Sequence, residues 1–291
     1  MFKLSIPKFI HQTWKTTRIP DHWQAGHQKW KDLHPDWTHI LWTDADIDAF
    51  MKLQPEYNQW RNFYWPIQRV DIWRYFALRE YGGIYSDLDM FPEKAVFFGS
   101  GNVFVVPSAN TPNVFTNALM ASDTSSNSRL FWTSVIDEVF HWHSKVNTYV
   151  KVGAFFSRHL EIMVSTGPLA LTRAVQKSFV NITVLPRRLW NPYDLSKAGD
   201  INDQNNDTII KIVEGSSWHE LDSTVLSTIF IYKSTFLVIL ALVIIAFSLQ
   251  GLHSFINLRA MKSKIKSFTL KKQITKNCSA SLTEIVDSVE F

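Results

Sequence analysis

The sequence predicts an α/β fold in which a mostly parallel sheet is covered by helices, with one transmembrane helix towards the C-terminus. Two observations predict the sheet: β-type segments alternate with helical ones, and a helix leads directly into a strand that carries two carboxylates. A long uncharged apolar segment predicts the membrane helix. We expect one domain over 1–228, a transmembrane helix over 229–256 and a disordered basic tail over 257–291.

Composition excludes several classes of protein. The 291 residues are 46% apolar, which is enough to bury a substantial core. Seven basic and three acidic residues follow Asn257 and account for the whole formal charge of +4. The neutral body lacks the electrostatic footprint of a nucleic-acid-binding protein, so no nucleic acid is expected as a partner. Cys278, the one cysteine, lies in the tail, so any metal in the body has oxygen or nitrogen ligands.

The N-terminal segment predicts a strand, a helix and a second strand in that order. Residues 6–13 alternate loosely as a strand does, and 39–42 form a second strand that ends at Asp44 and Asp46, which suit a turn or a helix cap. Residues 20–33 between them have helical spacing. One side of this helix carries Trp23, His27, Trp30 and Leu33.

A second helix is predicted over 66–81, because Pro66 is favoured in the first turn and Gly82 and Gly83 suit a C-terminal stop. A strand over 84–90 follows at once. In open α/β sheets ligands bind at the carboxyl ends of the strands, so we expect a site where this strand ends.

Two carboxylates lie in that strand. Alternation along a strand points Asp87 and Asp89 to one side and Leu88 into the core. Neighbouring carboxylates repel unless a cation joins them, which indicates a hard divalent metal, Mn²⁺ or Mg²⁺, with positions left for phosphate oxygens. The alternative is a solvated strand end, where such a triplet occurs by chance.

The preceding helix carries a charged pair among apolar neighbours. Asp71 and Arg74 are spaced i, i+3, so both lie on one face of the helix. Burying them is costly unless they are matched or open onto a cleft. They either form a closed buried ion pair or reach the same site as Asp87.

The apolar run from Thr235 to Ile256 has 22 residues and would span about 33 Å as a helix, close to the thickness of a bilayer core. A buried core helix is the alternative. Positive charge follows the run, which places the tail in the cytosol and the body in the lumen of an organelle. We expect this organelle to be the Golgi. The sequons at Asn181 and Asn206 suit that side. No apolar leader follows Met1, so an N-terminal anchor outside this reading frame, tail anchoring and a cytosolic body stay open.

The run over 66–89, PIQRVDIWRYFALREYGGIYSDLD, resembles the signature of the glycosyltransferases with a DXD sugar-binding region, glycosyltransferase family thirty-two. The resemblance extends to 6–15, 41–44, 165–168 and 216–219 and covers roughly 6–222. It is closest to members that act as inositol phosphorylceramide mannosyltransferases.

This resemblance implies a GT-A fold, a nucleotide-sugar donor, a divalent cation and retention of the anomeric configuration. Asp71 and Arg74 would hold the donor sugar and its phosphate, Asp87 would contact the ribose and the sugar, and Asp89 would bind the metal. Asp87 and Ser216 are further metal candidates. The remaining donor-binding candidates are Trp14, Asp44, Ser216, Trp218 and His219, with Asp222 following in the same loop.

The resemblance and the membrane helix together predict transfer of mannose from GDP-mannose to a membrane lipid such as inositol phosphorylceramide. The alternative enzyme is a mannosyl-, glucosyl- or galactosyltransferase acting on a protein glycan or a surface polysaccharide. The alternative outside catalysis is a non-catalytic subunit of a glycosyltransferase complex, and a partner subunit stays open in either case.

Overall fold

The computed structural model describes residues 6–99, 101–108, 113–145, 158–192 and 207–213, together with Ser248 and Gln250. Backbone contacts divide the chain into the units Met1–Ile231 and Tyr232–Phe291, and the fold below is that of the first unit. The expected domain boundaries stay predictions. In chain order the strands are β1 (Phe9–Thr13), β2 (Thr38–Trp42), β3 (Gly83–Ser86), β4 (Met90–Pro92), β5 (Val103–Pro107), β6 (Phe115–Ser122), β7 (Ile182–Val184) and β8 (Ile210–Ile212). The helices are α1 (Asp21–Leu33), α2 (Asp44–Met51), α3 (Tyr57–Arg61), α4 (Pro66–Tyr81), α5 (Ser126–Lys145), α7 (Arg158–Ser165), α8 (Pro168–Lys177) and α9 (Arg187–Trp190).

Six strands form the main sheet in the order β2-β1-β3-β6-β5-β7, and β4 pairs with β8 in a second, two-stranded sheet. In the main sheet β1 is parallel to β2 and β3, whereas β6 is antiparallel to β3 and β5. Since β7 is parallel to β5, β6 is the one reversed strand among those described. The predicted α/β class with a mostly parallel sheet is therefore confirmed.

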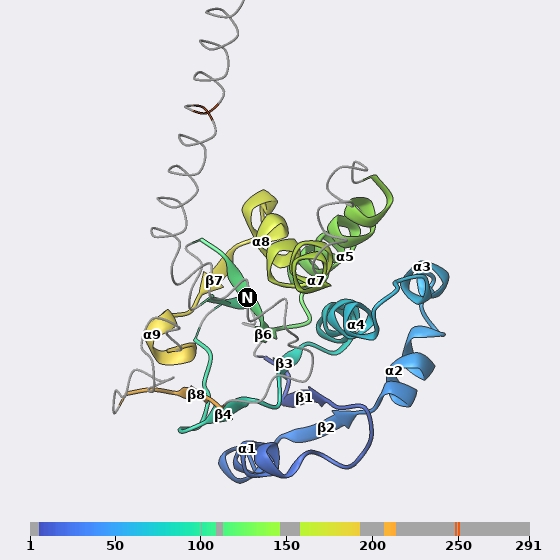
Figure 1. Cartoon of the computed structure of the whole chain (residues 1–291). Helices are drawn as coiled ribbons and strands as arrows, with labels where there is room; N and C mark the ends of the chain where they lie inside the picture. The colour runs from blue at the N-terminus through green and yellow to red at the C-terminus, as the bar shows by residue number, and fades with distance from the viewer. Residues whose placement is uncertain are drawn as a thin grey trace, which may run out of the picture. The chain divides into compact units, whose positions relative to one another are not determined.

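Helices pack on both sides of the main sheet (Figure 1), and an apolar cluster lies on each face. Alternate residues of its strands point to opposite faces, as the pleat requires. On β3, Tyr85 joins the core cluster that includes the buried faces of α4, α5 and α8. Ile84, its neighbour, joins the cluster on the other face with Trp30 of α1 and Trp190 of α9. Many of the large buried aromatic side chains lie in these two cores.

The N-terminal elements follow the predicted order with small differences at their ends. β1 begins at Phe9, three residues later than predicted, and α1 begins after Pro20. Asp44 and Asp46 do not form a turn: they lie in the first turn of α2, whose N-cap is Thr43. The Thr43 side chain accepts from the Asp46 N–H and the Asp46 carboxylate accepts from the Thr43 N–H, which is a capping box.

Helix α4 begins and ends where the sequence predicts, at Pro66 and Tyr81. Its stop is built on two glycines in the left-handed region, Gly82 at φ 62° and Gly83 at φ 88°. A Cβ on Gly83 would lie 2.6 Å from the carbonyl oxygen of Phe9. Glycine is therefore required where the chain turns from α4 into β3 beside β1.

The predicted strand over 84–90 is wrong in its second half. β3 ends at Ser86, residues 87–89 form a turn, and β4 begins at Met90 in the other sheet. The turn closes through the Met90 N–H, which donates to the Asp87 carbonyl at 3.2 Å. The chain leaves the main sheet here because β4 pairs with β8, and this bend sets the direction of both carboxylates.

Within the ranges given above, no helix is both long and apolar enough to cross a bilayer. The predicted membrane helix over 229–256 and the basic tail over 257–291 lie outside the described residues, apart from Ser248 and Gln250.

Candidate active site

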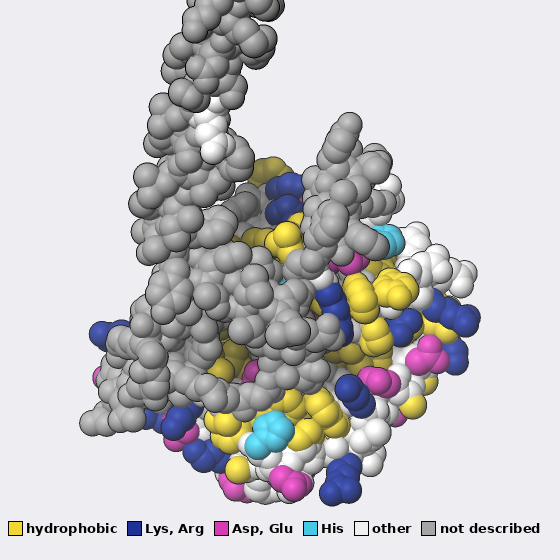
Figure 2. Space-filling view, viewed as in Figure 1, with side chains coloured by type: hydrophobic (Ala, Val, Ile, Leu, Met, Phe, Trp, Pro, Cys, Tyr) yellow, Lys and Arg dark blue, Asp and Glu magenta, His cyan; other side chains and the backbone are white. Residues whose placement is uncertain are grey.

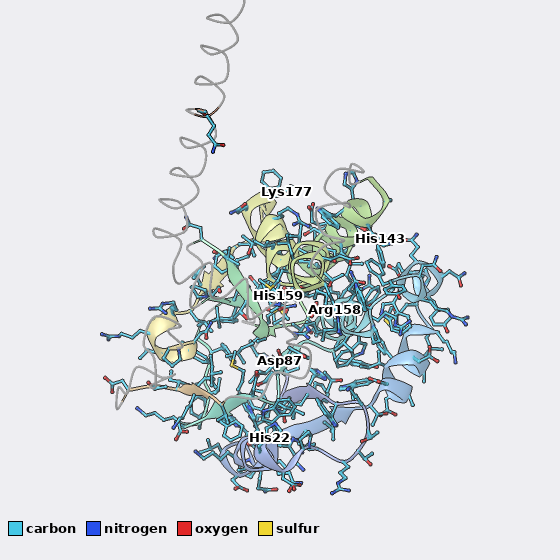
Figure 3. The ribbon with its side chains drawn as sticks, viewed as in Figure 1. His22, Asp87, His143, Arg158, His159 and Lys177 are labelled. Atoms are coloured by element: carbon cyan, nitrogen blue, oxygen red, sulfur yellow. The ribbon has the colours of Figure 1, made fainter. Side chains whose placement is uncertain are left out.

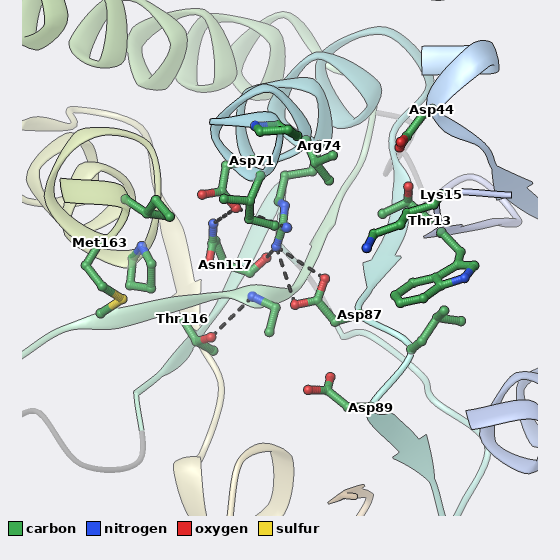
Figure 4. A pocket seen from close by; sticks show the side chains of 18 of the residues that line it. Thr13, Lys15, Asp44, Asp71, Arg74, Asp87, Asp89, Thr116, Asn117 and Met163 are labelled. Atoms are coloured by element: carbon green, nitrogen blue, oxygen red, sulfur yellow. Dashed lines mark hydrogen bonds and ion pairs between the residues drawn. The ribbon is translucent and has the colours of Figure 1, made fainter. Parts of the chain in front are cut away.

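A pocket of about 390 Å³ opens at the ends of β1 and β3 and at the start of β6 (Figure 4). Its volume lies within the range of small-ligand sites. Four carboxylates and three cations line it, with tryptophans, prolines and aliphatic side chains between them. The charged lining residues are Asp44, Asp71, Asp87, Asp89, Lys15, Arg74 and Arg158.

Asp71 and Arg74 lie on one face of α4 and form the predicted pair, with 3.0 Å between Arg74 Nη2 and Asp71 Oδ1. Both side chains are buried, yet both line the pocket. The pair is therefore not a closed contact on the helix surface. Burial raises the pKa of Asp71 to about 6, although Arg74 and a hydrogen bond from Thr166 act in the opposite direction.

Arg74 joins α4 to the Asp-x-Asp turn. Its Nη1 lies 3.3 Å from Asp87 Oδ1 and 2.8 Å from the carbonyl oxygen of Asn117. The guanidinium also lies over the Tyr85 ring, 4.6 Å from its centroid. Burial acts to lower the pKa of Arg74, but Asp87, Tyr85, Asp71 and Tyr75 together outweigh it, so the pKa is raised. Arg74 is therefore a fixed cation in the floor of the pocket.

The Asp87 side chain is 32% exposed and accepts a hydrogen bond from the Tyr85 hydroxyl at 2.5 Å. Figure 4 shows the Asp87 and Asp89 carboxyl groups projecting from the turn to the same side of the chain. The predicted common direction is thus present, although a turn rather than strand alternation produces it. Leu88 is buried beside Trp23, as predicted for a core residue, and it also lines the pocket.

Asp89 has the properties of a cation ligand. Burial, together with the Asp87 charge, raises the pKa of its carboxyl to about 7. Its Oδ1 is buried and has no hydrogen-bond partner among the described residues. A buried carboxylate oxygen is costly unless a proton, a donor or a cation satisfies it. The Asp87–Asp89 pair therefore fits a divalent cation, while no group of three His, Cys, Asp or Glu side chains suited to a metal occurs in the described part of the chain.

The wall on the β1 side consists of Trp14, Lys15 and Asp44, which all line the pocket. Trp14 contacts Trp23 edge to face with ring centroids 5.1 Å apart, and the Lys15 ammonium lies 5.6 Å from the Trp14 ring centroid. Burial raises the pKa of Asp44. Trp14 and Asp44, both predicted to bind the donor, are thus brought into the same pocket as Asp87.

Two polar residues behind Asp71 were missed as site residues by sequence reasoning. Asn117 of β6 donates from Nδ2 to Asp71 Oδ1 at 3.0 Å, and Thr166 donates from Oγ1 to Asp71 Oδ2 at 2.9 Å. Thr166 lies in the segment 165–168 that the resemblance marked, without a role. Asn117 carries no signal in the sequence. Together they satisfy both oxygens of a buried carboxylate.

The predicted candidates Ser216, Trp218 and His219, and Asp222 after them, lie outside the described residues. Among the described side chains on the face drawn in Figure 2, basic and acidic groups are interspersed, with no broad patch of one sign.

The family described as "Glycosyltransferase sugar-binding region containing DXD motif" matches residues 20–107, a range that contains Asp71, Arg74, Asp87 and Asp89. Residues 20–107 thus match the sugar-binding region that this family describes. The match ends at Pro107, the last residue of β5, so it covers the floor of the pocket, whereas Trp14 and Lys15 lie before it and Asn117 lies after it.

Named relatives agree with this match. The chain is 35% identical over 233 residues to Mannosyl phosphorylinositol ceramide synthase CSH1 of Saccharomyces cerevisiae, covering 77% of this chain and 56% of that protein. It is 30% identical over 236 residues to SUR1, the synthase of the same name from that yeast, covering 77% of this chain and 54% of the relative. It is 32% identical over 231 residues to Inositol phosphoceramide mannosyltransferase 2 of Schizosaccharomyces pombe, covering 76% and 60%. The chain thus spans little more than half the length of these relatives.

Among solved structures, PaToxG Glycosyltransferase is similar at a TM-score of 0.44 and 18% identity, over 60% of this chain and 71% of that one.

Proposed function

We propose that the protein is a retaining, metal-dependent hexosyltransferase of GT-A type that moves mannose from GDP-mannose to a membrane lipid such as inositol phosphorylceramide. The observation that carries the proposal is the union of Asp71, Arg74, Asp87 and Asp89 in one pocket. A charged nucleotide-sugar needs both a cation for its diphosphate and acceptors for its hydroxyl groups, and this set of side chains offers both.

Asp87 and Asp89 would hold the divalent cation, Mn²⁺ or Mg²⁺, with Ser216 as a further candidate. When bound, the cation neutralises the charge that develops on the leaving diphosphate. Arg74, fixed between Asp71 and Asp87, donates towards the donor's phosphate or sugar oxygens, and Asp71 accepts from sugar hydroxyls. Trp14 offers a ring face for the base beside Asp44, and Trp218 and His219 are proposed to complete the donor site.

In the transfer step, the bond between the anomeric carbon and the phosphate oxygen breaks, and a bond forms from the acceptor oxygen to the same face of that carbon. The acceptor proton passes to the leaving phosphate oxygen, so no separate carboxylate base is needed. The residues of the chain contribute by orienting the donor and by holding fixed charges around the leaving group.

The choice of mannose and of the lipid acceptor is supported by the names of the relatives, a mannosyl phosphorylinositol ceramide synthase of one yeast and an inositol phosphoceramide mannosyltransferase of another. GDP as the carrier of the mannose is part of the proposal. Incubating the purified chain and Mn²⁺ with labelled GDP-mannose, UDP-glucose or UDP-galactose, each with and without inositol phosphorylceramide, tests it. We expect transfer from GDP-mannose to the lipid. Transfer from a UDP-sugar, or to a glycan alone, would replace this substrate pair, and donor binding without hydrolysis or transfer would support a non-catalytic subunit.

Asp89→Asn tests the metal site within the same assay. The substitution keeps the shape and removes the charge, so we expect turnover to fall at least about 100-fold, the size of a lost transition-state contact. Asp137→Asn, on the exposed side of α5, is the matched control. Full turnover of Asp89→Asn at saturating Mn²⁺ would remove Asp89 from the metal site.

We further propose a single-pass membrane protein of the Golgi with a lumenal body and a cytosolic tail. The apolar run over 235–256 and the basic residues after it support this topology. Asn181 of the first sequon is exposed next to the short edge strand β7. A lumenal body predicts that glycosidase treatment of the cell-expressed protein shifts its mobility and that Asn181→Gln reduces the shift. An unglycosylated protein whose body is digested by protease in intact vesicles would place the body in the cytosol.

A further inference from the structure

A second pocket of about 220 Å³ adjoins the one described above. It lies between α2, α3 and the start of α4, and Asp44, Pro66 and Val70 line both pockets. These helices lie to one side of Asp87, which Figure 3 labels near the centre of the molecule. A nucleotide whose base lies by Trp14 and Asp44 can therefore extend from the first pocket into the second.

Apolar side chains form much of the wall of the second pocket. Ile47 and Trp60 are buried, and Trp60 Nε1 donates to the Arg69 carbonyl oxygen at 2.8 Å, which joins α3 to α4. Pro66 and Val70 add further apolar surface. Such a wall suits the faces of a flat heterocycle, whose polar atoms lie around its edge.

An acid and a base face the second pocket without pairing. Asp44 and Arg69 both line it, yet in the described part of the chain neither the carboxylate nor the guanidinium has a hydrogen bond or an ion pair. Burial raises the pKa of Asp44, while Lys15 and Arg69 act in the opposite direction, so the two groups lie within electrostatic range of each other. This arrangement suits a ligand that offers donors to the carboxylate and acceptors to the guanidinium.

The other two charged residues of the second pocket are placed differently. Asp48 is already matched, because Lys52 Nζ lies 2.7 Å from its Oδ2 and the Tyr57 hydroxyl donates to its Oδ1 at 3.2 Å. Arg61 is exposed and acts on Asp48. Asp44 and Arg69 are therefore the charged groups that the second pocket offers next to the first.

A guanine base carries both of the patterns that this pair requires. Its O6 and N7 are adjacent acceptors that match the fork of an arginine, and its N1–H and N2 amino group are adjacent donors that match a carboxylate. Adenine has an amino donor in place of O6, and uracil has neither N7 nor an amino group. A carboxylate and a guanidinium side by side thus distinguish guanine from both.

We propose that the second pocket is the base-specificity site of the donor, where Arg69 binds O6 and N7 of guanine and Asp44 binds N1–H and the N2 amino group. This inference rests on the proposed function, which places the base by Trp14. It assigns the choice of nucleotide to Arg69, a residue outside the pocket that holds the cation and the sugar.

Binding of nucleoside diphosphates to the full chain in detergent, with Mn²⁺ present, tests the site without requiring turnover. Calorimetry would compare GDP with ADP, UDP and inosine diphosphate, which lacks only the N2 amino group of GDP. We expect GDP to bind at least about 10-fold more tightly than ADP or UDP, and about 3-fold or more tightly than inosine diphosphate.

Two substitutions separate the two contacts. Arg69→Gln should weaken GDP binding at least about 10-fold and strengthen ADP binding, because a glutamine amide matches N6 and N7 of adenine, while UDP binding stays the same. Asp44→Ala should remove the advantage of GDP over inosine diphosphate, because the acceptor for the amino group is gone. Arg129→Gln, at an exposed arginine of α5, is the charge-matched control and should bind all four nucleotides as the unsubstituted chain does.

The site is refuted if the chain prefers GDP and Arg69→Gln keeps that preference. Where Arg69→Gln does not fold, Arg69→Lys takes its place, since lysine keeps the charge and loses the planar fork. Equal weakening of all four nucleotides would likewise refute it. An unsubstituted chain that binds UDP as tightly as GDP would refute both this site and the GDP donor of the proposed function. Guanine-selective binding that depends on Arg69, without any sugar transfer, would leave the site standing and overturn the proposed function.

Discussion

Replacing Asp71 with Asn separates the stability of this fold from its activity. Burial raises the pKa of Asp71 to about 6 from an ordinary value of 3.8, so the folded protein prefers the neutral carboxyl. A difference of about 2 in pKa corresponds to about 3 kcal/mol. Because the pKa of Asp71 is higher in the folded than in the unfolded chain, the group does not lower the free energy of unfolding below pH 4, and the loss grows as the pH rises to about 6. An uncharged Asn avoids that cost and can keep hydrogen bonds to Asn117 and Thr166.

We therefore expect Asp71→Asn to raise the free energy of unfolding by up to about 3 kcal/mol at pH 8 and to have little effect at pH 4, while donor turnover is lost. Urea unfolding at several pH values, with labelled-donor turnover on the same samples, measures both effects. Asp137→Asn on exposed α5 should change stability by less than about 0.5 kcal/mol at every pH. A variant that is less stable at pH 8 by the same amount as at pH 4 would show that the ion pair with Arg74 stabilises the fold, and the reasoning would fail.

Two further predictions concern the junction between β1 and α4. His11 is fully buried, with Nε2 3.0 Å from the Gly82 carbonyl and Nδ1 accepting from Trp42 Nε1, and burial lowers the pKa of its ring to about 4. As the pH falls from 6.5 to 4, the unfolded ring binds a proton and the folded ring does not, so the free energy of unfolding decreases by about 3 kcal/mol. His11→Gln removes this titration, so urea unfolding of the two chains should show a difference that changes over the same pH range. Gly83→Ala should lower the free energy of unfolding by more than about 2 kcal/mol, because φ is 88° and the added Cβ meets the Phe9 carbonyl. Gly99→Ala is the control, since a Cβ there meets nothing within 4 Å. Equal melting temperatures for the two variants would contradict this prediction.

The sequence predicted well what local chemistry decides. Helix α4 has the predicted bounds because proline and two glycines fix its ends, and the Asp71–Arg74 pair follows from spacing along one helix. The turn at 87–89 was missed because it depends on β4 pairing with β8, which lies more than a hundred residues further along the chain.

The same limit applies to the polar residues behind Asp71. Asn117 and Thr166 reach its carboxylate from 46 and 95 residues away. Periodicity cannot indicate contacts over such separations, because they depend on how β6 and the α7–α8 connection pack against α4. The sequence thus predicted the charged side chains that line the pocket, but not the residues that hydrogen-bond to Asp71 from behind.

The reversed direction of β6 has a consequence for how such a pocket can change. β1 and β3 arrive at the ligand edge, whereas β6 departs from it, so Thr116 and Asn117 stand at the beginning of their strand. Strands that run in opposite directions therefore meet at this edge, where the Asp87 N–H donates to the Ala118 carbonyl oxygen at 2.8 Å. A substitution at Thr116 therefore changes the lining of the pocket at the start of a strand, apart from the turn that carries Asp87 and Asp89.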